Sequence, residues 1–168
     1  LPFTSLIWIR NFLSNLRKGK KTNIKTICVG NIYIGGTGKT PLVMKIKNIL
    51  TNLKIKTAFI KKFYTDHVDE QKLLEKNGDL FCTKKRSDAL DNATKENFDC
   101  AIFDDGLQDN SIDYDLKFVC FNSDKWIGNG LLIPAGPLRE KINSISKYDA
   151  IFLNGYSENI QSIKNQIK

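Results

Sequence analysis

The most informative part of the chain reads Gly30-Asn31-Ile32-Tyr33-Ile34-Gly35-Gly36-Thr37-Gly38-Lys39-Thr40-Pro41. An apolar run precedes it and a helical pattern follows it, which is the strand–loop–helix context in which a glycine-rich loop binds phosphate. Gly35, Gly36 and Gly38 let the backbone wrap an anion, because glycine tolerates positive φ angles. The segment therefore predicts a nucleotide-phosphate loop formed by Gly35, Gly36, Thr37, Gly38, Lys39 and Thr40.

The last two residues of this loop are the ones expected to contact phosphate and metal through their side chains. Lys39 is expected to reach the β- and γ-phosphates, and the Thr40 hydroxyl is expected to face Mg²⁺. Pro41 suits the first turn of a helix, where a backbone N–H is not needed. The general loop pattern has glycine where this chain has Tyr33. A purely structural glycine-rich turn would explain the glycines but not the Lys-Thr pair that follows them.

The composition is typical of one globular domain. The chain has 168 residues, of which 41% are hydrophobic, enough to bury a core. No apolar run approaches the roughly 20 residues of a membrane-spanning helix. The four cysteines are widely spaced in apolar, strand-like runs, which predicts buried, reduced thiols and neither disulfides nor a zinc site.

The net charge of +8 is concentrated near the N-terminus. Residues 1–25 contain six basic and no acidic residues. The cluster Arg17-Lys18-Gly19-Lys20-Lys21 follows an apolar helical face formed by Trp8, Ile9, Phe12, Leu13 and Leu16. An amphipathic helix with a basic flank fits an anionic membrane surface. The same pattern also fits a helix packed on its own domain with a solvated tail. A nucleic-acid partner is not expected, because the rest of the chain is close to charge balance. We divide the chain into an N-terminal helix and linker (1–23) and a core domain (24–168).

Strand and helix patterns alternate along the core domain. Such alternation predicts an α/β fold of the P-loop NTPase type, in which a mostly parallel sheet carries helices on both faces in three layers. Ligands then bind at the carboxyl ends of the strands. Strands are expected at 24–30, 55–61, 80–82, 99–103, 116–122 and 148–153, helices at 41–53, 69–77, 86–96 and 157–167, and a long loop at 123–140.

Two adjacent acids follow the apolar strand at 99–103. In a P-loop enzyme, a carboxylate in this position holds Mg²⁺. Buried acids are also costly without a cation or hydrogen-bond donors nearby. We expect Asp104 to be the metal ligand, because it directly follows the apolar run, with Asp105 as a further candidate. The alternative is that one of the two acids caps the next turn.

Four other residues carry candidate functional groups. Asp69 and Glu70 begin a helix, where acids complement the helix dipole, and one of them could also accept a hydroxyl proton during phosphoryl transfer. Arg139 follows a constrained Gly-Pro loop, which suits phosphate recognition, although surface arginines are common. Arg86, at the start of another helix, is a weaker phosphate candidate.

Four segments together resemble the tetraacyldisaccharide 4′-kinase family, which acts in the lipid A pathway of Gram-negative bacteria. Their order and approximate spacing match over nearly the whole chain, and the family also lacks glycine at the position of Tyr33. The segments are Val29–Pro41, Asp104-Asp105-Gly106-Leu107-Gln108, Gly128-Asn129-Gly130 with Leu132–Glu140, and Asp149–Gly155.

The resemblance implies transfer of the ATP γ-phosphate to the 4′-hydroxyl of a tetraacylated disaccharide 1-phosphate, the lipid A precursor. It implies peripheral binding at the cytoplasmic face of the inner membrane through the N-terminal helix. It makes Asp69 the general base and Lys39 and Arg139 catalytic groups, with Mg²⁺ on Thr40 and Asp104. Glu70, Arg86, Asp105 and Gln108 are further candidates.

The sequence also departs from the family pattern. Lys61-Lys62-Phe63-Tyr64 replaces a Ser-Arg-Gly-Tyr segment, part of the segment before Asp69 is absent, and Asp109 stands where histidine is common. The family is also longer, with a C-terminal lobe that is missing here. The alternatives are therefore a regulatory or partitioning-type P-loop ATPase, or a weakened homologue that only binds ATP. A nucleic-acid module is a third alternative, which no aromatic-interleaved basic patch supports.

Overall fold

The computed structural model contains one six-stranded sheet in the part of the chain that it describes, which is Gly19 and residues 22–65 and 68–167. Every neighbouring pair of strands is parallel, in the order β3-β2-β4-β1-β5-β6. The strands are β1 (Lys25–Gly30), β2 (Thr57–Lys62), β3 (Leu80–Thr83), β4 (Cys100–Asp104), β5 (Leu116–Asn122) and β6 (Ala150–Asn154). The predicted N-terminal amphipathic helix lies outside the described residues.

Successive side chains of the central strands enter two different cores. Phe59 and Ile102 belong to one apolar cluster, whereas Ile60 and Phe103 belong to the other. This alternation follows from the two-residue period of a strand, which sends neighbouring side chains to opposite faces. All four side chains are fully buried, so both faces of the sheet are covered.

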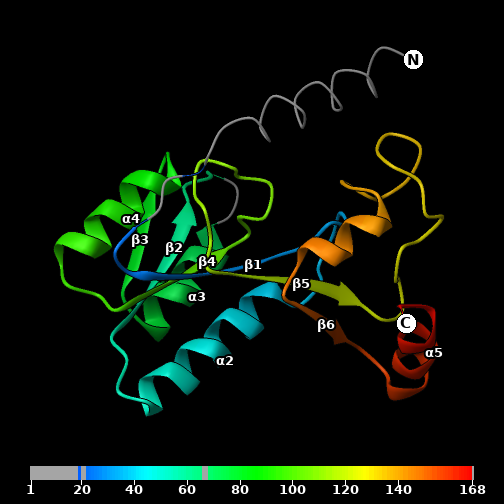
Figure 1. The fold of residues 1–168 in the computed structure, drawn as a ribbon, viewed down its shortest axis with the longest axis horizontal. Helices are drawn as coiled ribbons and strands as arrows, with labels where there is room; N and C mark the ends of the chain where they lie inside the picture. The colour runs from blue at the N-terminus through cyan, green and yellow to red at the C-terminus, as the bar shows by residue number, and fades with distance from the viewer. Residues whose placement is uncertain (1–18, 20–21, 66–67, 168) are drawn as a thin grey trace.

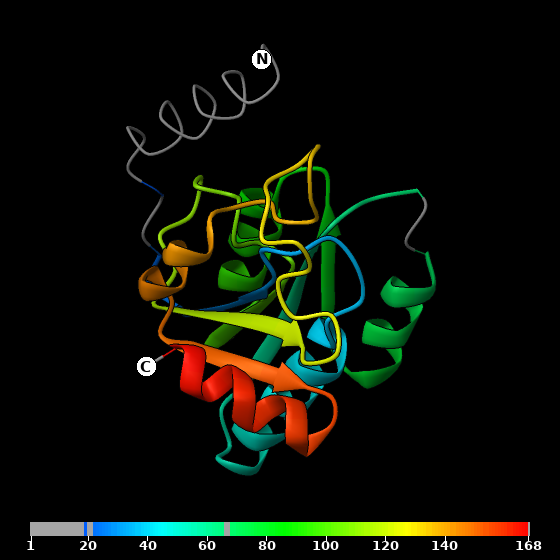
Figure 2. The same cartoon turned by 90° about the vertical axis from the view of Figure 1, so that its right-hand side faces the viewer.

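Helices cover both faces and complete three layers (Figure 1). On one face, α2 (Lys39–Asn52) and α3 (Val68–Asn77) bury Val43 and Leu74. On the other, α4 (Arg86–Lys95) packs its Ala89, Leu90 and Ala93 against the sheet. Helix α5 (Ser157–Ile167) follows β6 at the end of the sheet (Figure 2). The predicted α/β class is confirmed.

The elements differ in detail from those expected. Helix α2 begins at Lys39, two residues early, because Gly38 takes a left-handed conformation (φ 82°) and turns the chain directly into the helix. Strand β2 begins two residues late, since the Ile55 N–H bonds to Leu50 O at the end of α2. Strand β6 also begins two residues late.

A short 3₁₀ helix, η1 (Ile142–Lys147), was not expected. Ile142, Ile145 and Tyr148 pack against the same apolar cluster to which α4 contributes. Their spacing of three residues matches the period of a 3₁₀ helix, so the sequence did contain a signal for it.

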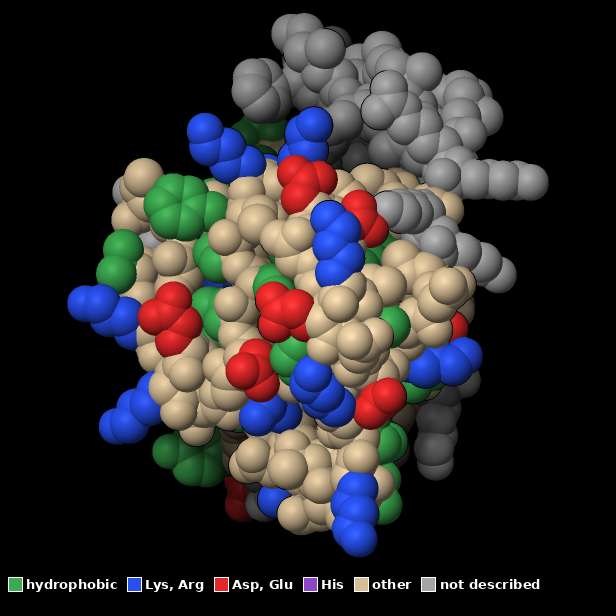
Figure 3. All heavy atoms as spheres, turned by 90° about the vertical axis from the view of Figure 1, so that its left-hand side faces the viewer, with side chains coloured by type: hydrophobic (Ala, Val, Ile, Leu, Met, Phe, Trp, Pro, Cys, Tyr) green, Lys and Arg blue, Asp and Glu red, His purple; other side chains and the backbone are tan. Residues whose placement is uncertain are grey.

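The surface carries charges of both signs (Figure 3), and three of the four cysteines are buried as predicted. One face of the molecule shows acidic and basic side chains interspersed (Figure 3), and no continuous basic patch is visible there. Cys28, Cys100 and Cys120 are buried and Cys82 is partly exposed. Within the described ranges, no helix has both the length and the apolar character needed to span a membrane.

Candidate active site

The site is built at the carboxyl ends of three adjacent strands. Because these strands are parallel, β1, β4 and β2 all end at the same edge of the sheet. Their register sets Val29 of β1 opposite Asp104 of β4, and Asp104 opposite Lys61 of β2. The chain leaves β1 into the glycine-rich loop, so this loop lies beside Asp104.

The glycine-rich loop has the backbone expected of an anion-binding turn. Gly35 and Gly38 have positive φ angles of 128° and 82°. Asn31, fully buried at the start of the loop, donates from Nδ2 to Gly35 O at 3.2 Å and holds the turn closed. The Thr37 hydroxyl is buried without a hydrogen-bond partner. The sequence reasoning missed Asn31, although a polar residue directly after a buried strand was a usable signal.

Thr40 and Asp104, the two predicted metal ligands, lie close together. Thr40 Oγ1 lies 3.4 Å from Asp104 Oδ2, while Asp104 Oδ1 is buried with no hydrogen-bond partner. A buried, unpartnered carboxylate oxygen is costly. A hydroxyl and one carboxylate are ligands that Mg²⁺ uses together with phosphate and water oxygens. The residues present therefore fit a magnesium ion. No group of three or more His, Cys, Asp or Glu side chains suited to a metal occurs among the residues placed by the structure.

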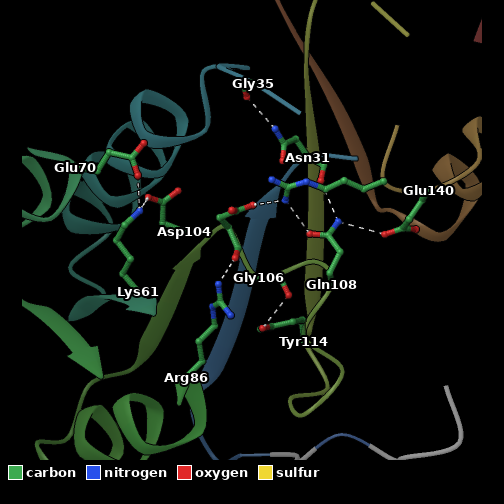
Figure 4. A network of polar contacts seen from close by, with 12 residues as sticks. Asn31, Gly35, Lys61, Glu70, Arg86, Asp104, Gly106, Gln108, Tyr114 and Glu140 are labelled. Atoms are coloured by element: carbon green, nitrogen blue, oxygen red, sulfur yellow. Dashed lines mark hydrogen bonds and ion pairs between the residues drawn. The ribbon is translucent and has the colours of Figure 1, made fainter. Parts of the chain in front are cut away.

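Lys61 is a central member of the site that the sequence reasoning missed. Its Nζ lies 2.6 Å from Asp104 Oδ2 and 2.7 Å from Glu70 Oε2, and its side chain is only 5% exposed (Figure 4). Burial lowers the pKa of this ammonium, but the charges and hydrogen bonds of Asp104 and Glu70 outweigh burial and raise the pKa overall. Glu70, at the start of α3, is thereby connected to Asp104.

Arg139 is held beside the loop by backbone pairing. Its N–H donates to Ile32 O at 2.7 Å, and the Ile34 N–H donates to Pro137 O at 2.9 Å. These bonds lay the segment 137–139 along the start of the glycine-rich loop. The guanidinium of Arg139 lies 3.6 Å from Asp105 Oδ1.

Gln108 and Glu140 fix the position of that guanidinium. Gln108 Oε1 accepts from Arg139 Nη1 at 3.3 Å, and Gln108 Nε2 donates to Asn31 O at 3.0 Å and to Glu140 Oε1 at 3.2 Å (Figure 4). The Tyr148 hydroxyl donates to Glu140 Oε2 at 3.2 Å. The network connects the predicted candidate Gln108 to Glu140, which the sequence reasoning did not single out.

Arg86 lies on the other side of the acidic turn. It is 7% exposed and donates to Asp109 Oδ2 at 3.1 Å and to the main-chain oxygen of Asp105. Burial alone raises the pKa of Asp109, but the hydrogen bonds from Ser111 and the charge of Arg86 outweigh burial and hold that pKa below its ordinary value. The geometry gives Arg86 a role in supporting this turn. Its predicted contact with phosphate stays a prediction.

Asp69 is in the first turn of α3 with an exposed side chain. Its neighbour Glu70 contacts Lys61, so the turn that carries Asp69 is tied to the residue opposite Asp104. The role of Asp69 as a base stays a prediction. Of the predicted residues, the contacts described above bring together the glycine-rich loop, Asp104, Asp105, Gln108, Arg139 and Glu70.

Comparisons with known proteins agree with this geometry. The family model for tetraacyldisaccharide-1-P 4′-kinase, LpxK, matches residues 1–79 and 65–168. The two matches together cover the whole chain. They overlap at 65–79, the segment that includes Asp69.

The curated relatives carry the same name. A tetraacyldisaccharide 4′-kinase of Pelagibacter ubique is 56% identical over all of this chain and 54% of its own length. One of Rickettsia bellii is 34% identical over 88% of this chain and 53% of its own length. The chain therefore spans about half the length of the curated relatives that it matches.

Solved structures extend the comparison to the fold. A crystal structure of LpxK from Aquifex aeolicus in complex with ATP superposes with a TM-score of 0.77 and 26% identity, covering 92% of this chain and 56% of that one. FtsY from Mycoplasma mycoides shares the fold alone, with a TM-score of 0.54 and 15% identity over 89% of this chain and 60% of that one. From the family match along its whole length, the chain belongs to the tetraacyldisaccharide-1-P 4′-kinase family.

Proposed function

We propose that this chain takes part in transferring the γ-phosphate of ATP to the 4′-hydroxyl of a tetraacyldisaccharide 1-phosphate. One observation carries the proposal most strongly. In a chain of this family, Thr40 Oγ1 lies 3.4 Å from a buried carboxylate with an unpartnered oxygen, next to the phosphate loop. The ATP-bound LpxK structure that shares the fold supports ATP as the phosphate donor.

The phosphate groups of ATP would be held by fixed positive groups. The first amides of α2 point out of the helix without intrahelical partners, and together with the helix dipole they favour an anion. Lys39 adds an ammonium in the same turn. Arg139, oriented by Gln108, adds a planar guanidinium that suits phosphate oxygens.

Thr40 and Asp104 would hold Mg²⁺, which when bound neutralises charge that develops on the phosphate oxygens. Asp69 would accept the proton of the 4′-hydroxyl as the hydroxyl oxygen forms its bond to the γ-phosphorus. The bond from that phosphorus to the bridging oxygen breaks at the same time, and ADP leaves. Lys39 and Arg139 would stabilise the charge on the migrating group.

We infer that the lipid acceptor binds at the surface around α3. Four large apolar side chains, close together in sequence around Asp69, are each more than 40% exposed. Exposed apolar side chains gathered in one region mark interaction surfaces. They are Phe63, Tyr64, Val68 and Leu73. We place the acyl chains of the acceptor against them, with the 4′-hydroxyl toward Asp69.

A lipid acceptor also calls for contact with a membrane. The six basic residues in the first 25, with no acidic residue among them, suit an anionic leaflet. We propose peripheral binding at the cytoplasmic face of the inner membrane through residues 1–23.

The direct test is phosphoryl transfer with the chain, Mg²⁺, radiolabelled ATP and tetraacyldisaccharide 1-phosphate. The expected product carries the label at the 4′-position. Lys39→Ala should reduce transfer by at least about a hundredfold, because a preorganised charge contact to the phosphoryl group is lost. Lys45→Ala, an exposed lysine of the same helix, is the matched control. Folded, ATP-binding protein that hydrolyses ATP but never labels the lipid would favour the regulatory ATPase alternative.

A further inference from the structure

Lys61 is an unusual residue to find at the end of a buried strand. It is 4% exposed, and the β2–β4 register sets it directly opposite Asp104. A buried ammonium is costly unless it is paired and hydrogen-bonded. The contacts of its Nζ atom show which groups compensate the cost of burying this charge.

The ammonium of Lys61 joins two carboxylates from different elements. Asp104 Oδ2, at the end of β4, lies at 2.6 Å, and Glu70 Oε2, in α3, lies at 2.7 Å. An ammonium has three donors on a compact head, so it can serve both acceptors at once. Because Lys61 contacts only Oδ2, Asp104 Oδ1 keeps no hydrogen-bond partner.

A second contact ties the same turn of α3 to the same segment. Gln71, the residue after Glu70, is 9% exposed and donates from Nε2 to Tyr64 O at 3.0 Å. Consecutive residues of the helix are thus tied to β2 and to the segment just after it. Helix α3 has only ten residues, and so short a helix depends on tertiary contacts for its order.

We propose that Lys61 is a positioning residue, which holds the first turn of α3, and with it Asp69, against the carboxylate of Asp104. The effect of Lys61 on the rate of the reaction rests on the proposed function. The structural part of the proposal, the coupling of α3 to Asp104, is independent of activity.

Amide hydrogen exchange tests the structural part. Lys61→Met should speed exchange at the amides of residues 72–75 by about tenfold, since a charged hydrogen bond that orders the preceding turn is lost. Amides in the middle of α2 should keep wild-type rates. Lys56→Met, an exposed lysine just before β2 whose Nζ bonds to Glu96 O, is the matched control. Unchanged exchange in α3 would overturn the proposal.

A milder variant keeps the test decisive where Lys61→Met does not fold. Glu70→Ala removes only the contact between α3 and Lys61 and leaves Lys61 paired with Asp104. It should speed exchange in α3 as Lys61→Met does. Asp69→Ala removes an acid from the same turn, but one that Lys61 does not contact. This variant should therefore speed exchange in α3 less. Equal effects of the two variants would mean that exchange in α3 depends on the charge at the helix N-terminus and not on the contact between Glu70 and Lys61.

Steady-state kinetics test the consequence for the reaction. Lys61→Met should lower kcat by at least about tenfold and change KM for ATP less, because Lys61 contacts Asp104 and Glu70 and makes no direct contact with the phosphate loop. Lys61→Arg, which keeps the charge, should recover part of kcat. A variant with wild-type kcat would overturn the proposal. A wild-type chain that makes no product would instead count against the proposed function, and the exchange experiment would still decide on Lys61.

Discussion

Asp104 shows how one side chain can connect several parts of a site. It is 1% exposed, and its two oxygens have different surroundings, with Oδ2 shared by Lys61 and Thr40 and Oδ1 unpartnered. Removing one member of a buried ion pair leaves an uncompensated charge, which costs more than removing both. The site residues should therefore behave as a coupled set.

A double-mutant cycle tests this coupling. Asp104→Asn and Lys61→Met should each lower the free energy of unfolding by about 3 kcal/mol, because each leaves a buried charge with too few partners. The double variant should be less destabilised than the sum by about 1–3 kcal/mol. Urea unfolding of the four proteins measures the difference. Additive effects would show that the pair is not coupled.

Part of the residue-scale picture could be predicted from sequence. Asp104 could be found because an acid directly after an apolar strand is unusual, whereas the loop before Arg139 left its role open and the family resemblance made it a candidate. Lys61 could not be found in this way, since a lysine at the end of a strand looks like an ordinary exposed flank. Its partner is set by the β2–β4 register, which depends on how the whole sheet assembles.

The Arg86–Asp109 pair gives a pH-dependent prediction. Because the pKa of Asp109 is lower in the folded chain than its ordinary value of 3.8, its charge stabilises the fold above that value. This stabilisation is lost as the pH falls toward the folded pKa. Asp109→Asn should cost about 1–2 kcal/mol of unfolding free energy at neutral pH, and less at pH 3.

Chemical denaturation at the two pH values measures this change. Asp113→Asn, an exposed aspartate four residues further on, serves as the control and should show a small effect at both. A cost for Asp109→Asn that is the same at pH 7 and pH 3 would contradict the role assigned to the charge.

At the scale of elements, the junction between the glycine-rich loop and α2 fixes the backbone of the proposed phosphate site. Gly38 is the N-terminal cap of α2 in a left-handed conformation, and a Cβ added to it would lie 2.7 Å from Asn154 Nδ2. Gly36 has no such restriction, since an added Cβ would meet nothing within 4 Å. A side chain is therefore expected to cause strain at Gly38 and none at Gly36.

Alanine substitutions test this difference. Gly38→Ala should lower the unfolding free energy by about 1–2 kcal/mol, because an L-residue is strained at this φ angle. Gly36→Ala should change it by less than about 0.5 kcal/mol. Thermal or urea unfolding compares them directly. Equal costs would contradict the junction geometry described here.

Most elements could be predicted from apolar periodicity, whereas their contacts could not. Helices α2, α3 and α4 and all six strands appear close to their expected places, because each buries one regular pattern of apolar side chains. The pairing of segment 137–139 with the start of the loop could not be predicted. It joins residues about one hundred positions apart through backbone hydrogen bonds, which leave little trace in side-chain patterns.

At the scale of the whole molecule, the parallel sheet brings distant motifs to one edge. The alternation of strands and helices was enough to predict this arrangement, because parallel strands need helical crossovers and end at a common edge. Around α3, Phe63, Tyr64, Val68 and Leu73 are exposed, and six of the eight excess positive charges lie in the first 25 residues.

Binding to lipid vesicles tests the proposed membrane contact. The chain should sediment with vesicles that contain anionic lipid and bind poorly to neutral vesicles, since juxtamembrane basic residues contribute about 1 kcal/mol each. Replacing Arg17, Lys18, Lys20 and Lys21 with glutamine should weaken binding by at least about tenfold, and raised salt should do the same. Equal binding to neutral and anionic vesicles would contradict the electrostatic contact.

The central claim is that a phosphate-binding half and a proton-accepting half meet at one edge of the sheet. The most direct measurement is the rate of phosphoryl transfer to tetraacyldisaccharide 1-phosphate by Asp69→Asn at saturating Mg²⁺ and ATP. We predict a loss of at least about a hundredfold with ATP affinity unchanged, because only the base is removed, while Glu75→Gln on the same helix keeps the wild-type rate. Wild-type transfer by Asp69→Asn would contradict the account.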